Sequence, residues 1–422
     1  MSSFDATTDA VIPVIPDTTT TAGTTAGTIA GTTTTTTAEP PKRQIRTWDD
    51  LELKTDLLRG IYAAGFDTPS EIQQAAILPI ISNHDVIAQA QSGTGKTGSF
   101  TIGALQLVDI ANRSTQVLIL SPTHELATQT ASTVRLIGGL MDGLIVKTLL
   151  GGTPVADDAQ DLRNNPPHVI IGCTGRVFDM IRRGNLQINN LRILVLDEAD
   201  EMLSEGFKEQ IYNIFKHVPN SMQVALFSAT MPEDIMAVTT KFMREPVKIM
   251  MKPEELNLEG IKQFYIAVAN DHEKYDRLKE LFEQITLSQC IIYANSVKRV
   301  TELHTAMQNE GFPVCAIHST MTKSERQQVI QQFRQGVFRV MISSNITARG
   351  IDVQQVSVVI NFDITNCVHT YLHRIGRSGR WGRKGVAINF VTRHDTHYMR
   401  NIEAHYGVTI TELTPGFNFN RI

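Results

Sequence analysis

Residues 85–97 read DVIAQAQSGTGKT, a short apolar run followed by a glycine-rich loop. Apolar runs of this length are typical of buried parallel strands, and the loop is then placed to open a helix, the context that a phosphate-binding loop requires. Gly93 and Gly95 would let backbone N–H groups surround a β-phosphate. Lys96 would reach the β- and γ-phosphates, and the Thr97 hydroxyl would bind Mg²⁺. A chance glycine-rich turn is the alternative, and the strand before the loop disfavours it.

The same alternation of short apolar runs and helix-like stretches continues along the chain. The first half contains QVLILSP, HVIIGC, RILVLDEAD and QVALFSAT, and the second half contains QCIIYANS, PVCAIHS, FRVMISSN, SVVINFD and GVAINFV. Each run ends in small or polar residues, at the edge where open α/β sheets bind ligands. With 422 residues the chain is too long for one core. We therefore expect two α/β domains with parallel sheets, residues 46–250 and 261–422, joined by a charged linker at 251–260.

Composition restricts the class of protein further. Residues 1–40 contain 15 Thr, so residues 1–45 are expected to form a disordered tail. The chain is 42% hydrophobic, its apolar runs are too short to span a membrane, and its four cysteines lack zinc or disulfide spacing. These features predict a soluble protein of a reducing compartment. Residues 260–422 carry 19 Lys and Arg against 13 Asp and Glu, which permits a polyanionic partner without requiring one.

A second acidic element, LVLDEAD, occupies residues 194–200. An apolar strand would deliver Asp197 to its end, where the carboxylate can hold Mg²⁺, usually through water. Glu198 would then orient or deprotonate an attacking water. A solvated acidic helix start is the alternative, because acidic pairs are common at helix N-termini. Together with the phosphate-binding loop, the segment predicts binding and hydrolysis of a nucleoside triphosphate.

Three segments together resemble the DEAD-box RNA helicases: DEAD at 197–200, SAT at 228–230 and HRIGRSGR at 373–380. The resemblance covers residues 46 to about 415, and LNLEGIKQFYIAV and RSGRWGRKGVAINFV further resemble the initiation factor 4A group. It implies two tandem RecA-like domains and an RNA-stimulated ATPase that unwinds short duplexes with ATP and Mg²⁺. It also implies sequence-nonspecific RNA binding, regulatory protein partners, no membrane association, a monomer, and a role in translation initiation or mRNA metabolism. The sequence shows no basic cluster of the nuclear-targeting type, which favours the cytoplasm, with the nucleus as the alternative.

The resemblance also assigns residues to the nucleotide. Phe66 would stack on the base and Gln73 would pair with the adenine edge, although their segment alone reads as an ordinary loop and helix start. Arg377 and Arg380 would act as arginine fingers from the second domain rather than as a plain basic patch, so hydrolysis would require closure of the two domains. Residues implied to bind nucleotide are Phe66, Gln73, Ala90, Gln91, Ser92, Gly93, Thr94, Gly95, Lys96, Thr97 and, at the ribose, Asp352. Implied catalytic residues are Lys96, Asp197, Glu198, Arg377 and Arg380, with Thr97 and Asp197 as Mg²⁺ ligands.

Weaker signals resemble the RNA groove of the family. Hydroxyls and bare backbone N–H groups grip phosphates without reading bases, although each segment alone is more often a strand-to-helix turn. The implied RNA contacts are Pro122, Thr123, His124, Gly151, Gly152, Thr174, Gly175, Arg176, Asn295, Ser296, Arg339 and Ser344. Ser228 and Thr230 would link the ATP site to this surface.

Three departures from the family pattern fall on the RNA side. His124 replaces the Arg of PTRELA, Cys173 and Thr174 replace the first two residues of TPGR, and Ser344 and Asn345 replace the first two of TDxxARG. The ATP motifs are intact, which predicts preserved ATP chemistry with an altered grip on RNA. An ATP-gated RNA clamp, whose partners block hydrolysis, is an alternative to the helicase. A DNA translocase is disfavoured by the DEAD segment and by the lack of accessory domains.

Overall fold

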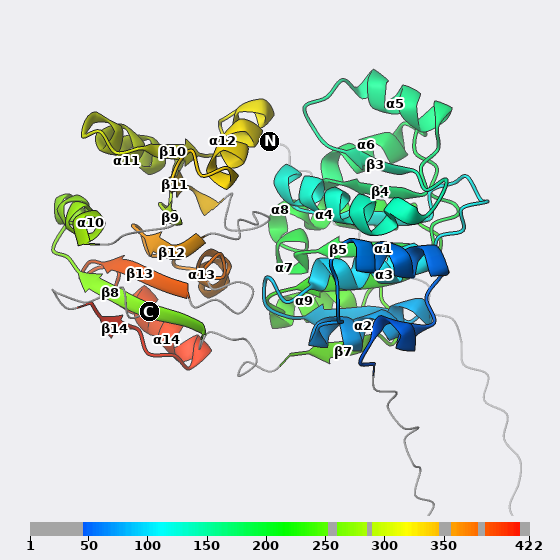
Figure 1. Ribbon diagram of the computed structural model, residues 1–422, viewed down its shortest axis with the longest axis horizontal. Helices are drawn as coiled ribbons and strands as arrows, with labels where there is room; N and C mark the ends of the chain where they lie inside the picture. The colour runs from blue at the N-terminus through cyan, green and yellow to red at the C-terminus, as the bar shows by residue number, and fades with distance from the viewer. Residues whose placement is uncertain (1–44, 252–259, 285–288, 346–355, 379–384, 414–422) are drawn as a thin grey trace, which may run out of the picture. The chain divides into compact units, whose positions relative to one another are not determined.

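The computed structural model describes residues 45–251, 260–284, 289–345, 356–378 and 385–413 (Figure 1). The predicted tail at 1–45 and the predicted linker at 251–260 lie almost entirely outside these residues. Two seven-stranded sheets, each parallel throughout, organise the described chain. This confirms the expected fold class of two parallel α/β units.

The first sheet has the strand order β3-β4-β2-β5-β6-β1-β7. Its strands are β1 (Val86–Gln89), β2 (Val117–Leu120), β3 (Val146–Leu149), β4 (Val169–Gly172), β5 (Ile193–Asp197), β6 (Gln223–Ser228) and β7 (Val247–Met250). All residues of β2, β4, β5 and β6 are buried, which explains their continuous apolar sequences. The carboxyl ends of all seven strands therefore meet along one edge.

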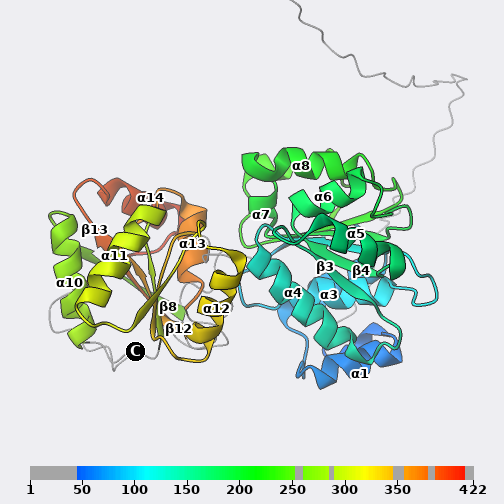
Figure 2. The same cartoon turned by 90° about the horizontal axis from the view of Figure 1, so that it is seen from above.

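Helices cover both faces of the first sheet. They are α1 (Thr55–Ala63), α2 (Glu71–Ile81), α3 (Lys96–Leu107), α4 (His124–Ile137), α5 (Val155–Asn164), α6 (Thr174–Arg182), α7 (Ala199–Met202), α8 (Glu205–Phe215) and α9 (Glu233–Thr239). Successive strand residues face opposite sides, so Val86 packs with α1 to α4 whereas Ile87 packs with α6 to α9. Figure 2 shows α6 and α8 on the side of the sheet opposite α1.

The second sheet has the order β10-β11-β9-β12-β13-β8-β14. Its strands are β8 (Ile261–Ala267), β9 (Gln289–Tyr293), β10 (Val314–Ile317), β11 (Val340–Ser343), β12 (Val356–Asn361), β13 (Gly385–Val391) and β14 (Thr411–Glu412). Helices α10 (Asp271–Gln284) and α11 (Val297–Asn309) pack on one face. Helices α12 (Lys323–Arg334), α13 (Val368–Ile375) and α14 (Thr396–Tyr406) pack on the other.

Two local features fix the chain beside the first sheet's ligand edge. Ser70 is the N-cap of α2, and Gln73 Oε1 accepts from the Ser70 backbone N–H at 2.8 Å, a donor that the helix itself cannot satisfy. Trp48 is fully buried, and its indole Nε1 donates to the Phe66 carbonyl at 2.8 Å. The loop that carries Phe66 is therefore fixed by Trp48 and by the start of α2. Within the described residues, no helix is long and apolar enough to span a bilayer.

Candidate functional site

Three sequence motifs meet at the carboxyl edge of the first sheet. Strands β5, β6 and β1 are neighbours, and they end respectively in the DEAD segment, the SAT segment and the glycine-rich loop. Gln89 is in register with Ser228, and the backbone N–H of Ala90 donates to the Ser228 carbonyl at 3.0 Å. Segments more than 100 residues apart in sequence therefore share one site, at the position that parallel α/β sheets use for ligands.

The glycine-rich loop has the backbone of an anion cradle. Gly93 and Gly95 have φ values of 87° and 106°, which favour glycine, and Gly95 caps the N-terminus of α3. A Cβ on Gly95 would lie 2.8 Å from Gln73 Nε2, so the loop also has no room for a side chain there. The first turn of α3 directs free N–H groups into this loop, an arrangement that binds phosphate.

The Lys96 side chain folds back toward the start of this loop. Its side chain is buried, and its Nζ donates to the Ala90 carbonyl at 2.6 Å. Burial lowers the pKa of Lys96, whereas the Glu198 and Asp197 carboxylates act to raise it. A polyanionic ligand bound at this loop would compete with the Ala90 carbonyl and the two carboxylates for the Lys96 ammonium group.

Asp197 and Glu198 form a buried carboxylate pair. Burial, and then the Glu198 carboxylate, raise the pKa of Asp197 to about 7. Glu198 has φ 50°, a strained conformation for a residue with a side chain, and such strain is concentrated at functional sites. Its Oε2 atom is buried without a hydrogen-bond partner among the described residues. An oxygen-only donor set of the Thr97 hydroxyl and the Asp197 carboxylate, beside an unsatisfied carboxylate, fits a hard cation such as Mg²⁺.

Asp200 joins the SAT segment to the second sheet's helices. Its carboxylate accepts hydrogen bonds from Ser228 Oγ at 2.8 Å and Thr230 Oγ1 at 2.7 Å. His373 Nε2 of α13, fully buried, lies 2.8 Å from Asp200 Oδ2. Sequence reasoning did not single out Asp200 or His373, although both lie inside motifs that it quoted.

One pocket collects most of the predicted nucleotide residues. It is lined by Phe66, Ser92, Gly93, Gly95, Lys96, Thr97, Asp197, Glu198 and, from the second domain, Arg377, together with Gly98, Leu126, Gln129 and Thr133. Arg377 is buried, and its Nε donates to the His373 carbonyl at 3.2 Å. Predicted residues Arg380 and Asp352 lie outside the described residues.

Other predicted nucleotide residues are engaged with the protein itself. Gln73 is buried; its Oε1 accepts from the Ser70 N–H at 2.8 Å and its Nε2 donates to the Gly95 carbonyl at 3.3 Å. Thr94 Oγ1 donates to the Gln91 carbonyl at 2.7 Å within the loop. The adenine contact of Gln73 therefore stays a prediction, and its observed contacts tie the start of α2 to the phosphate loop.

The remaining half of the same edge carries the predicted RNA segments. Strands β3, β4 and β2 are neighbours, and they lead to Gly151–Gly152, Thr174–Arg176 and Pro122–His124. Thr123 caps α4 by accepting from the Leu126 N–H at 3.2 Å. The sheet thus places the predicted nucleotide residues on β5-β6-β1 and the predicted RNA residues on β3-β4-β2.

Two basic residues of this surface, Arg176 and His124, are buried or paired within the protein. Arg176 forms an ion pair with Asp158, and its guanidinium also donates to the Thr153 hydroxyl at 2.8 Å. Burial lowers the pKa of His124, and its Nδ1 is buried without a hydrogen-bond partner among the described residues. An RNA phosphate at this surface would compete with Asp158 for Arg176.

The second domain brings together some of its predicted RNA residues but not all. Asn295, Ser296 and Ser344 follow the carboxyl ends of β9 and β11. Arg339 precedes β11, so it lies at the opposite end of that strand from Ser344. The structure therefore separates Arg339 from the other predicted contacts. Asn345, the departure next to Ser344, accepts two hydrogen bonds from Arg374, at 2.9 Å from Nε and 2.6 Å from Nη2.

A phosphate-type loop and two buried acids on one parallel sheet, with an arginine from a second sheet lining the same pocket, define a two-domain helicase-type NTPase. Residues 70–238 match the DEAD/DEAH box helicase model, and residues 273–382 match the helicase conserved C-terminal domain. The chain therefore belongs to the DEAD-box helicase family.

Individual relatives agree with this assignment. The chain is 52% identical over 369 residues to the ATP-dependent RNA helicase eIF4A of Chaetomium globosum, covering 87% of this chain and 92% of the relative. It is similar to the structure of Saccharomyces cerevisiae Dbp5 bound to RNA and ADP BeF3, with TM-score 0.81, 34% identity, and coverage of 87% and 95%. A Dbp5 variant bound to a Gle1 variant and IP6 gives TM-score 0.73 and 33% identity, with coverage of 89% and 96%.

Proposed function

We propose that this chain is an RNA-stimulated ATPase that unwinds short RNA duplexes in the manner of eIF4A. The observation that carries the proposal is the single pocket shared by the glycine-rich loop, Glu198 and Arg377. Each of the three supplies a part that phosphoryl transfer needs: a phosphate cradle, a base for water, and a cation for the developing charge.

The catalytic roles follow from the geometry of each residue. The α3 N-terminus and the Lys96 ammonium group hold the phosphates of ATP. Glu198, with its unsatisfied Oε2, accepts the proton of the attacking water. Arg377 neutralises charge on the transferring phosphoryl group. Thr97 and Asp197 would hold Mg²⁺, which would supply positive charge that offsets the charge of the phosphates.

The neighbouring half of the sheet edge supports binding of the RNA backbone. Thr123 and Thr174 lie at the N-termini of α4 and α6, where free backbone N–H groups can bind phosphates without reading bases. The two hydroxyls are engaged within the protein, since that of Thr123 accepts from the Leu126 N–H and that of buried Thr174 donates to Gln210 Oε1. Asp200, which joins Ser228 and Thr230 to His373, links the nucleotide site to the second domain. We further propose that residues 46–250 and 261–422 are the two domains, and that the chain serves translation initiation or mRNA metabolism in the cytoplasm with regulatory protein partners, as the eIF4A relatives suggest.

The test is ATP turnover with and without single-stranded RNA, comparing wild type with Glu198→Gln. RNA should stimulate the wild type, and the variant should lose about 10²–10⁴-fold in turnover while keeping ATP binding, because only the proton acceptor is removed. Turnover that RNA does not change, or that survives the substitution, would contradict the proposal. Duplex unwinding over many turnovers by the purified chain then separates a helicase from an RNA clamp.

A further inference from the structure

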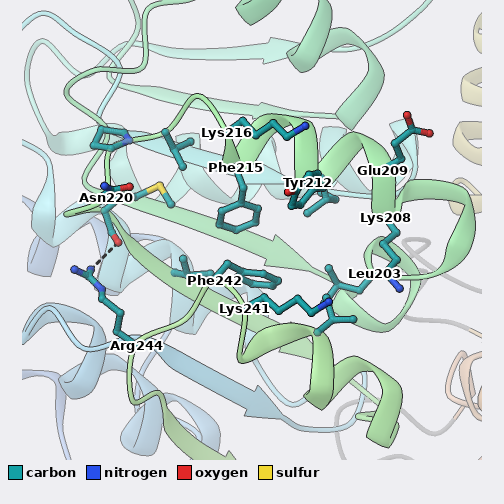
Figure 3. A pocket seen from close by; sticks show the side chains of 16 residues that line it. Leu203, Lys208, Glu209, Tyr212, Phe215, Lys216, Asn220, Lys241, Phe242 and Arg244 are labelled. Carbon is teal, nitrogen blue, oxygen red and sulfur yellow. Dashed lines mark hydrogen bonds between the residues drawn. The ribbon is translucent and has the colours of Figure 1, made fainter. Parts of the chain in front are cut away.

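A large pocket opens on the first domain away from the nucleotide site (Figure 3). It has a volume of about 680 Å³ and lies between α8, α9 and the segments that follow them. It includes Val224, near the amino end of β6, and Met222, which precedes that strand, whereas Ser228 ends the strand at the nucleotide edge. The described lining of this pocket shares no residue with that of the nucleotide pocket.

The floor of the pocket is apolar. The rings of Phe215 and Phe242 stack with their centroids 4.4 Å apart, and Val218 and Val238 line the same space. Figure 3 shows the two rings facing each other in the middle of the pocket. Tyr212 stands at its rim with 62% of its surface exposed. An exposed apolar recess of this kind is typical of an interaction site, because a partner that covers it removes apolar surface from water.

The rim of the pocket is cationic. Its charged residues are Lys208, Lys216, Lys241 and Arg244, against the single acid Glu209. Lys208 and Lys241 are exposed, and their side-chain ammonium groups have no hydrogen-bond or ion-pair partner within the part of the chain that the structure describes. Arg244 is fixed by donating to the Met222 carbonyl at 2.9 Å. In Figure 3, Lys208 and Lys241 lie at one end of the pocket and Arg244 lies at the other.

We propose that this pocket docks a protein partner through a short acidic segment that inserts one large aromatic or aliphatic side chain. The apolar floor takes the inserted side chain, and carboxylates on either side of it pair with the cations at the two ends. RNA fits less well, because the space between the cations is lined by the apolar side chains of Phe215, Phe242 and Val238, which an apolar side chain fills better than a phosphate does. The proposal concerns a partner and does not depend on how ATP is turned over.

A random 12-residue peptide library, displayed and selected on the full chain, tests the proposal. Selection is followed by removal of peptides that also bind the double variant Lys208→Glu, Lys241→Glu. We expect a consensus with one Trp, Phe or Leu flanked by Asp and Glu. The synthetic, fluorescein-labelled consensus peptide should bind the double variant at least tenfold more weakly in anisotropy titrations. The control variant Lys248→Glu, at an exposed position of β7, should bind the peptide as wild type does.

Two readouts separate the proposal from its rivals. ATP turnover should be unchanged in the double variant, which shows that both exposed substitutions leave the fold intact. Absence of a consensus, a consensus without acids, or equal binding of the peptide to wild type and double variant overturns the proposal. A double variant that loses affinity for single-stranded RNA, while peptides bind equally, would instead assign the surface to RNA and overturn it as well.

Discussion

Arg374 is a buried cation that this chain surrounds with neutral acceptors, and Asn345→Asp should stabilise the second domain by supplying a charged one. Its guanidinium has 0% exposure and donates to side-chain oxygens of Asn345, Asn361 and Asn295 and to the Asp363 carbonyl. Burial lowers the pKa of Arg374 to about 10, so its charge is only partly compensated. The substitution keeps the shape of residue 345 and replaces the amide with a carboxylate.

The expected gain follows from that shift in pKa. A fall from the ordinary 12.5 to about 10 corresponds to roughly 3 kcal/mol of uncompensated burial, at about 1.36 kcal/mol per pKa unit. Asn345 is exposed, so solvent screens the new pair and the gain should be about 1–2 kcal/mol. A carboxylate paired with Arg374 has a folded-state pKa below its unfolded value. The gain is therefore present above about pH 4 and is lost as the pH falls through the folded-state pKa.

Hydrogen–deuterium exchange measures this effect at the strands concerned. Amides of β9 and β12, which flank Arg374's acceptors, should exchange about 5–30-fold more slowly in Asn345→Asp at pH 7. Asn401→Asp adds the same charge to the exposed face of α14 and should change nothing. Exchange that is unchanged or faster in Asn345→Asp, or a slowing that Asn401→Asp reproduces, would refute the reasoning.

Three further substitutions test the first domain. His124→Arg should steepen the log–log salt dependence of single-stranded RNA binding by up to about 0.7, and an unchanged slope would remove His124 from the RNA surface. Because burial lowers the pKa of His124 below 6.5, binding of RNA by the wild type should also tighten as the pH falls below 6.5. Gly95→Ala should lower ATP affinity at least tenfold, since φ is 106° and the new Cβ would meet Gln73, and normal affinity would contradict the cradle. Arg176→Met should lower the free energy of unfolding by about 1–3 kcal/mol in urea, because the buried Asp158 carboxylate then depends on the more distant Lys147 Nζ, at 3.7 Å, and on the Thr153 hydroxyl. A neutral result would show that the ion pair with Arg176 contributes little.

The buried strands were predictable from sequence, and the edge strands were less so. All ten apolar runs named from the sequence are strands, five in each sheet. The strands missing from that set include β3 and β7, whose residues alternate or are half-buried because each lies at an edge of the sheet. Edge strands need apolar residues on one side only, so they leave no continuous run to read.

Which side chains gather at the ligand edge was also predictable, because strand ends carry them there. The hydrogen-bond and ion-pair partners of these side chains were not predictable. Nothing in the sequence says that Arg176 pairs with Asp158 or that Gln73 turns toward Gly95, since a long side chain chooses among acceptors that tertiary packing supplies. For Arg339 the family resemblance implies a phosphate contact, and its position before β11 puts it at the other end of that strand from Ser344, so this contact stays a prediction.

The geometry also indicates how the two sites communicate. His373 and Arg374 are consecutive residues of α13, and they point about 100° apart around the helix. His373 contacts Asp200, which holds the SAT hydroxyls, whereas Arg374 holds Asn295 and Asn345 at the predicted RNA edge of the second sheet. A shift of α13 therefore changes both sets of contacts together, because the two residues share one rigid turn. Asn345, where the family has Asp, offers Arg374 a neutral amide oxygen in place of a carboxylate, so this contact of α13 is weaker. We therefore expect this chain to differ from its relatives in the strength of coupling between RNA and ATP rather than in the chemistry of hydrolysis.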